Sequence, residues 1–235
     1  MIFNESYQEL LQKFKNQGYN FIHFDEFNAL KNNQIILRHD IDLEIDCAIK
    51  TALFEYEMGI KSTYFFLLKD ESYNLLSASN QNKVNKIREL GHQISLHFDL
   101  SIYQHPKEGL KEEIKIFNSS FSENINIISI HRPNNDFLEN PKNFFHIDNS
   151  YEEKFTKNNI CYYADSGGSF RFGHPTESNE FKNCNNMQLL IHPVWWTIRP
   201  EEQGHSSIKE AVQSVIDNKK NKMENHFKKN IKTFK

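Results

Sequence analysis

The sequence predicts an α/β protein whose mainly parallel sheet is covered by helices and is either open or closed into a barrel. Short apolar runs that are typical of strands alternate with segments of helical period from the beginning of the chain. Polar and reactive residues follow five of the strand-like runs, in the segments RHDID, HFD, HRP, ADS and IHP. The carboxyl ends of the strands in a β/α barrel share one face, so these five segments are expected to meet there.

The elements are placed by apolar spacing and by the residues that end them. Helices are expected where apolar residues recur every three or four positions, namely after Tyr7, over 45–56, 84–90 and 106–117, and from 206 onward. Strands are expected at 20–24, 34–38, 62–68, 92–98, 125–131, 161–166 and 187–193. Gly18, Gly59 and Gly91 each follow a helical segment, where glycine is the common residue for ending a helix.

Composition narrows the class of protein. A chain of 235 residues can form one α/β domain, and we expect a single domain over 1–235 with a basic helical extension at about 206–235. The formal net charge of -3 does not favour a nucleic-acid partner. The three cysteines are scattered and indicate neither a disulfide framework nor a thiolate zinc site. The N-terminus lacks a secretory signal and no run is long enough to span a membrane, so a cytoplasmic protein is predicted.

Asp40 and Asp42 end the buried run 34–38 and would point the same way on a strand. Asp42 could simply cap the following helix, but this leaves Asp40 unexplained, because a buried carboxylate needs a partner. A divalent metal ion on one acid and a basic group on the other would relieve their repulsion. Arg132, which follows the run ISIH, is expected to pair with one of these acids.

Histidines lie at the ends of two other strands. His97 in SLHFD is the best candidate for an imidazole metal ligand. His192 in LLIHP is either a satisfied core histidine or a reactive one, and Asp165 is either a turn residue or the acid that orients it. Trp195 and Trp196 either pack in the core or form a wall for a sugar ring.

In their order and spacing these segments resemble the motifs of the polysaccharide deacetylase family, metal-dependent hydrolases of N-acetyl groups on sugars. The resemblance runs from about Leu37 to Trp196 and is greatest to the branch whose first motif is arginine-histidine-aspartate-aliphatic-aspartate. It implies a distorted (β/α)7-type barrel. It further implies that Asp40 is the general base and Asp42 a metal ligand.

The remaining roles are carried over in the same way. The resemblance implies that His97 is a second metal ligand and that Arg132 orients the base. Asp165 matches the aspartate of the fourth motif, and His192, in Leu190-Ile191-His192, is implied to be the general acid. We assign substrate binding to Trp195, Trp196 and His39.

The second metal-binding histidine of the family would stand four residues after His97, where this chain has Ser101. Asp99, His131 or His39 could supply the third ligand, since carboxylate and imidazole both suit zinc and similar ions. Alternatively the metal is weakly bound or absent.

We therefore expect a zinc-dependent hydrolase that removes an N-acetyl or other N-acyl group from an amino sugar. A cytoplasmic intermediate of surface-glycan biosynthesis, such as an O-antigen or capsule precursor, is the expected substrate. Two alternatives remain: a catalytically silent barrel that binds a glycan intermediate, and a hydrolase of another non-peptide C–N bond. The basic C-terminal stretch could contact an anionic membrane surface, or it could be a solvated terminal helix.

Overall fold

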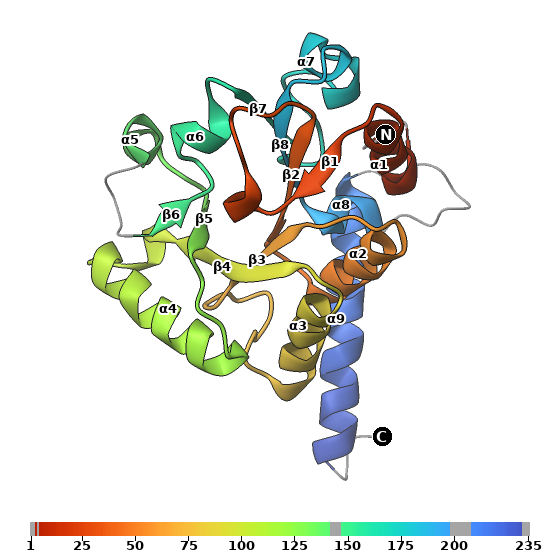
Figure 1. The fold of residues 1–235 in the computed structure, drawn as a ribbon. Coiled ribbons are helices and arrows are strands. Elements are labelled where there is room, and N and C mark those ends of the chain that lie inside the picture. The colour runs from red at the N-terminus through yellow and green to blue at the C-terminus, as the bar shows by residue number, and fades with distance from the viewer. Residues whose placement is uncertain (1–2, 4, 142–146, 198–207, 232–235) are drawn as a thin grey trace.

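The computed structural model describes residues 3, 5–141, 147–197 and 208–231, and in this part of the chain an eight-stranded sheet is surrounded by helices (Figure 1). The strands are β1 (Asn20–Ile22), β2 (Gln34–Ile41), β3 (Thr63–Leu67), β4 (Gln93–Asp99), β5 (Ile127–His131), β6 (Asp148–Asn149), β7 (Ile160–Ala164) and β8 (Asn186–Ile191). All their pairings are parallel, in the order β6-β5-β4-β3-β2-β8-β7, and β1 also pairs with β2. The expected α/β class is confirmed.

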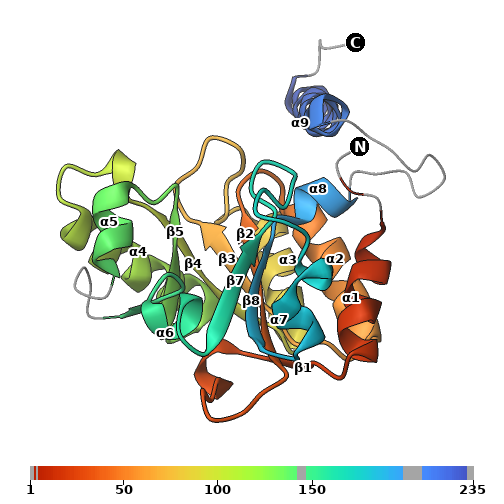
Figure 2. The same ribbon diagram turned by 90° about the horizontal axis from the view of Figure 1, so that it is seen from above.

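Helices connect the strands and lie outside the curled sheet, as the view from above shows (Figure 2). The α-helices are α1 (Tyr7–Asn16), α2 (Ile45–Glu57), α3 (Ala78–Glu89), α4 (Pro106–Phe121), α5 (Asn135–Glu139), α6 (Glu153–Thr156), α7 (Asn179–Lys182), α8 (Pro193–Thr197) and α9 (Ile208–Asn230). Short 3₁₀ helices are η1 (Phe24–Glu26), η2 (Leu100–Ile102) and η4 (Pro175–Glu177). The sequence signals explain their ends. Ser6 and Glu9 form a capping box at the start of α1, for example.

Alternation along the strands separates two apolar layers. Outward side chains of β3 and β4, such as Tyr64, Phe66 and Leu96, pack against α2, α3 and α4 in the largest core. Inward side chains, among them Ile36 and Phe65, fill the interior below the carboxyl ends of the strands. A fully buried residue of this size contributes about 1.5–3 kcal/mol of stability. The interior is therefore a packed core, and polar groups in it need partners.

The sheet curls into a half barrel. Its end strands β6 and β7 are not paired with each other in the described chain, and side chains link the two ends instead. The rings of Tyr151 and Tyr162 lie 6.1 Å apart, centroid to centroid. The Gln188 amide of β8 donates to the carbonyl groups of Ser150 and Phe155, at 3.0 and 2.7 Å.

Helix α9 extends away from the body of the molecule (Figures 1 and 2). It is held by Val215, which packs on Cys47 and Val194, and by Lys222, which pairs with Glu44 and Asp46. Residues 206–207 and 232–235 of the expected extension lie outside the described residues. None of the described helices is long and apolar enough to cross a membrane. Contact of the C-terminal stretch with a membrane surface stays a prediction.

Candidate active site and metal centre

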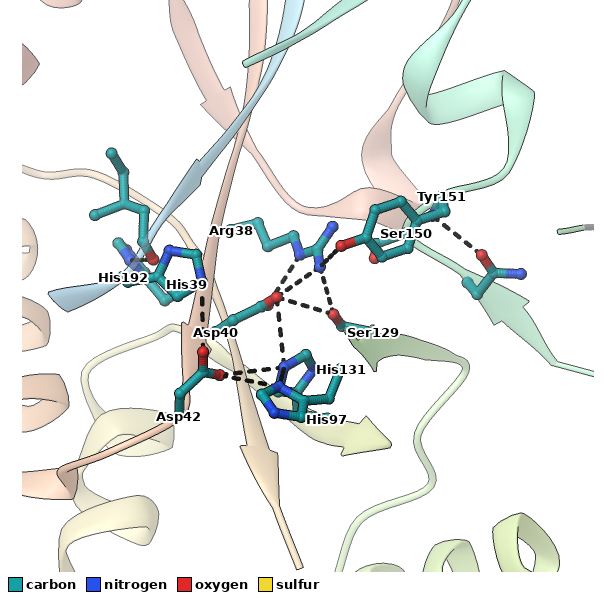
Figure 3. A network of polar contacts seen from close by, with 12 residues as sticks. Arg38, His39, Asp40, Asp42, His97, Ser129, His131, Ser150, Tyr151 and His192 are labelled. Atoms are coloured by element: carbon teal, nitrogen blue, oxygen red, sulfur yellow. Dashed lines mark hydrogen bonds and ion pairs between the residues drawn. The ribbon is translucent and has the colours of Figure 1, made fainter. Parts of the chain in front are cut away.

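The candidate site is built on β2, which is buried along its whole length. Because side chains alternate, Arg38, Asp40 and Asp42 all point into the half barrel, whereas His39 and Ile41 point outward (Figure 3). The strand register places polar residues of neighbouring strands at the same level of the sheet. His97 of β4, for example, is paired with Ser129 of β5. Polar groups from three strands thus meet at the carboxyl end of the sheet.

Asp42, His97 and His131 form a cluster in which one ligand atom from each residue faces the same point. His97 Nε2 and His131 Nδ1 lie 3.2 and 3.5 Å from Asp42 Oδ1, and 3.1 Å from each other. A tetrahedral zinc ion with bonds of about 2.0–2.1 Å holds its ligand atoms about 3.3 Å apart. The three atoms therefore already have the spacing that a small divalent ion requires.

The electrostatics of the cluster agree with a cation site. Asp42 Oδ1 is buried and accepts no hydrogen bond, so its contacts with the two imidazoles are electrostatic. Burial opposes ionisation of Asp42, but His131 and His97 hold the pKa of its carboxyl well below the usual range. A charged carboxylate and two imidazole nitrogens are a donor set that suits zinc and similar ions.

The third member of the cluster is His131, one of the residues considered for this position. The other carboxylate considered, Asp99, is engaged elsewhere: it accepts hydrogen bonds from the backbone and hydroxyl of Ser101 at 2.8 and 2.6 Å, at the start of η2. Ser101 therefore belongs to a turn, and the imidazole comes from the neighbouring strand. Asp42 itself is not a helix cap, because Glu44 caps α2.

Asp40 is held by Arg38, which lies two residues earlier on the same strand. Arg38 Nε and Nη2 donate to the two carboxylate oxygens of Asp40, at 2.9 and 2.6 Å. Both side chains are buried, and Ser129 Oγ donates to the same carboxylate at 3.2 Å. Burial alone would raise the pKa of Asp40, but the Arg38 guanidinium, with help from His97, holds it below its usual value. Asp40 is thus ionised at neutral pH.

Arg132 does not hold this acid. Its side chain is exposed, and its backbone takes a left-handed φ of 47°, which turns the chain directly after His131. Within the described residues it makes no ion pair with Asp40 or Asp42, and the guanidinium on Asp40 belongs to Arg38. The expected pairing of Arg132 is therefore corrected. A catalytic role for Arg132 stays a prediction.

Asp165 and His192 come together at the ends of β7 and β8. The Asp165 carboxylate accepts the backbone N–H of His192 and lies 2.6 Å from its Nδ1, so Nε2 faces the cluster, 3.7 Å from Asp42 Oδ2. Burial disfavours a charged imidazole, but Asp165, Asp42 and Asp40 more than offset this and raise the pKa of His192 to about 9. His192 is therefore a cation at neutral pH, and 12% of its side chain is exposed.

His39 is not available to a substrate or to the metal cluster. It points away from the site, is completely buried, and its Nε2 lies 2.7 Å from Glu55 Oε1. Glu55 also accepts hydrogen bonds from Tyr7, Ser62 and Tyr64. The assignment of His39 to substrate binding is therefore wrong, and the reason is the alternation of β2, which places neighbours of Asp40 on the outer face.

The two tryptophans differ in burial and in their contacts. Trp196 is 6% exposed, stacks on Phe3 at 3.9 Å between ring centroids, and its indole N–H donates to Asp165 at 2.8 Å. It therefore packs in the core and helps to fix the acid that orients His192. Trp195 is only partly buried, and a contact of its ring with substrate stays a prediction.

The sequence interpretation missed Arg38, Ser129 and Tyr151. Arg38 pairs with Asp40, and Ser129 and Tyr151 contact this pair, with the Tyr151 hydroxyl 3.2 Å from Arg38 Nη2. For Arg38 a signal existed, since an arginine inside the apolar run QIILR, two residues before Asp40, must share its face. No local sequence pattern indicated that the Tyr151 side chain would reach Arg38.

Comparisons with known proteins give fold-level similarity alone. No protein-family model matches the chain, and no curated protein matches it. Among solved structures, a family 4 carbohydrate esterase domain of a xylanase from the hindgut metagenome of Trinervitermes trinervoides is 12% identical, with a TM-score of 0.41 over 80% of this chain and 83% of that chain. A family 4 carbohydrate esterase from Bacillus anthracis is 16% identical, with a TM-score of 0.41 over 92% of this chain and 86% of that chain.

A peptidoglycan deacetylase from Bacillus subtilis is 10% identical, with a TM-score of 0.41 over 87% of this chain and 100% of that chain. These identities and TM-scores are low, so the chemistry proposed below depends on the geometry of the site. These three structures are named as carbohydrate esterases or as a peptidoglycan deacetylase.

Proposed function

We propose that this protein is a metal-dependent hydrolase that removes an N-acetyl, or another N-acyl, group from an amino sugar. The observation that carries the proposal is the arrangement of an ionised carboxylate and a charged imidazole around the Asp42–His97–His131 cluster. Asp40 Oδ2 lies 3.6 Å from His97 Nε2 on one side, and His192 Nε2 lies 3.7 Å from Asp42 Oδ2 on the other. An amide hydrolase needs both a base and an acid, whereas a binding protein needs neither.

Asp42, His97 and His131 would hold the metal ion, which we propose to be zinc. When bound, a divalent ion supplies Lewis acidity, which polarises an acyl carbonyl and makes a water molecule more acidic. Asp40, ionised and fixed by Arg38, accepts a proton from water as the water oxygen attacks the acyl carbon. His192, oriented by Asp165, donates a proton to the amine nitrogen as the C–N bond breaks.

The substrate in this proposal is an acylated amino sugar, and the leading candidates are intermediates of surface-glycan assembly. The neighbouring structures support a sugar substrate in general, since their names are those of a carbohydrate esterase and a peptidoglycan deacetylase. The side chains of His192 and Asp42 are 12% and 27% exposed, so the cluster is open to solvent on this side.

The test is the release of acetate from N-acetylated amino sugars by the zinc-loaded protein and by its Asp40→Asn variant. This variant keeps the shape of the base but removes its ability to take a proton. A fall in kcat of several orders of magnitude at unchanged zinc content is expected, since general base catalysis alone contributes about 10²–10⁴-fold. Equal turnover in the two proteins would remove Asp40 from the role of base.

A further inference from the structure

A groove with a volume of about 740 Å³ lies beside the proposed catalytic site. This volume is within the range of small-molecule sites, about 300–1,000 Å³. The groove is formed by the chain after β5, by α6, by β7 and by the loop after β7. The lining residues that the argument uses are Arg132, Lys157, Tyr162, Tyr163, Arg171 and Phe172.

The groove is lined by chain neighbours and contacts of the residues that carry the proposed chemistry. Arg132 follows the cluster residue His131, and two other lining residues, Ala164 and Ser166, stand on either side of Asp165. Tyr151 also lines the groove, and its hydroxyl contacts Arg38. A ligand in the groove would therefore be adjacent to an acyl group held at the cluster.

The groove carries two arginines that have no anionic partner among the described residues. Lys157 is neutralised by Glu153, at 2.9 Å. Arg132 and Arg171 are both exposed, and neither makes an ion pair with any residue that the structure describes. Two uncompensated guanidinium groups thus line one cavity.

A residue with a left-handed backbone conformation lies at or near each arginine. Arg132 has a left-handed φ of 47°, which is costly for a residue with a side chain. Arg171 packs closely on Gly167: a Cβ atom added to Gly167 would lie 2.9 Å from Arg171 Nη2. Gly167, with a φ of 71°, therefore permits both the turn and the position of the guanidinium.

Aromatic rings complete the lining. Tyr162 and Tyr163 come from β7, and Phe172 is next to Arg171 with 99% of its surface exposed. Aromatic faces beside a few charged groups are typical of sites for ring-shaped polar ligands. A guanidinium binds phosphate through two parallel hydrogen bonds. A phosphate monoester carries about two negative charges at neutral pH, which matches two arginines, whereas a sugar carboxylate carries one.

We propose that this groove binds a phosphate group attached to the acylated amino sugar, through Arg132 and Arg171. The substrate class is then a phosphate-bearing amino sugar rather than a neutral glycan chain. This inference rests on the proposed function for the identity of the sugar, but the groove and its charges are independent of catalysis.

The test measures binding without turnover, in the zinc-loaded Asp40→Asn protein. Calorimetry would compare N-acetylglucosamine 1-phosphate with N-acetylglucosamine and with glucuronic acid. The phosphorylated sugar should bind about tenfold more tightly than either of the others, or better, which corresponds to one or two charge-assisted hydrogen bonds. Adding uridine diphosphate N-acetylglucosamine distinguishes the source of the phosphate: tighter binding than the monophosphate indicates a nucleotide-linked sugar, and weaker binding indicates a simple sugar phosphate.

Arg132→Gln, Arg171→Gln and their combination should remove the preference for the phosphorylated sugar. Lys107→Gln is the matched control, because it removes an exposed positive charge from α4, outside the groove. Equal affinity for phosphorylated and neutral sugars would overturn the inference, and so would a preference that survives in the double arginine variant, since the phosphate would then sit on the metal. A preference for phosphate without acetate release from any acylated sugar phosphate would instead count against the proposed hydrolysis.

Discussion

Arg38 and Asp40 lie two residues apart on one buried strand, and the guanidinium of the first clamps both carboxylate oxygens of the second, at 2.9 and 2.6 Å. The pair is formed within a single strand, so its geometry is fixed by the extended backbone itself. It leaves Asp40 charged inside the barrel, beside a cluster that has the spacing of a metal site.

Replacing Arg38 tests whether it positions and charges the base. Arg38→Met leaves a buried carboxylate without its partner, so the free energy of unfolding should fall by about 3–5 kcal/mol. The pKa of Asp40, now depressed, should rise, and the acid limb of the kcat profile should move to higher pH. A pH series of kcat on zinc-loaded protein measures this. Lys107→Gln, which removes an exposed positive charge from α4, is the control and should leave the acid limb in place.

The Arg38–Asp40 pair should make the stability of the protein depend on pH. The pKa of Asp40 is lower in the folded than in the unfolded protein. The pair therefore contributes its full stabilisation to the folded protein at pH values above the pKa of the unfolded state, about 4. That contribution is lost as pH falls through the depressed pKa. Urea unfolding between pH 3 and about 7 should show a steeper loss in the wild type than in Arg38→Met. Parallel curves would show that the pair does not respond to protonation of Asp40.

His131→Ala tests the identity of the third ligand. The variant should lose most of its zinc, because only two ligands of the cluster remain. Asp99→Asn should keep its zinc, because Asp99 caps η2. Zinc per protein chain, measured by mass spectrometry after dialysis, separates the two. Full zinc in His131→Ala together with loss in Asp99→Asn would transfer the role to Asp99.

Asp165→Asn tests the acid. The pKa of His192 is raised to about 9 mainly because Asp165 outweighs the effect of burial, so the charged imidazole is present below that pH and is lost above it. Without the carboxylate, the alkaline limb of kcat should move to lower pH by about 1–3 units. Trp196→Phe, which removes one hydrogen bond to Asp165, should give a smaller shift in the same direction. An unmoved alkaline limb in Asp165→Asn would exclude His192 as the titrating acid.

Much of the fold was predictable because its signals are local. Apolar runs, helix-ending glycines and polar residues after the strands all lie in short stretches of sequence, and the expected strands correspond to β1–β5, β7 and β8. Asp40, Asp42 and His97 were placed together for the same reason: each directly ends, or follows, a buried run.

What the sequence did not settle depends on contacts across the barrel. His131 is the third member of the cluster, and the pairing of β4 with β5 brings it beside His97. The pairing expected of Arg132 is made by Arg38, which the alternation of β2 places on the same face as Asp40. His39 cannot reach the site, because it lies one residue from Asp40 and so on the opposite face, where it contacts Glu55.

The central claim is that hydrolysis depends on a metal ion at the Asp42–His97–His131 cluster, and a zinc titration tests it most directly. Protein stripped with a chelator would be titrated with zinc while acetate release from an N-acetylated amino sugar is followed. The account predicts that activity rises to a plateau at one zinc per chain in the wild type and stays at background in Asp42→Ala. Acetate release that does not depend on zinc, or that is retained in Asp42→Ala, would contradict it.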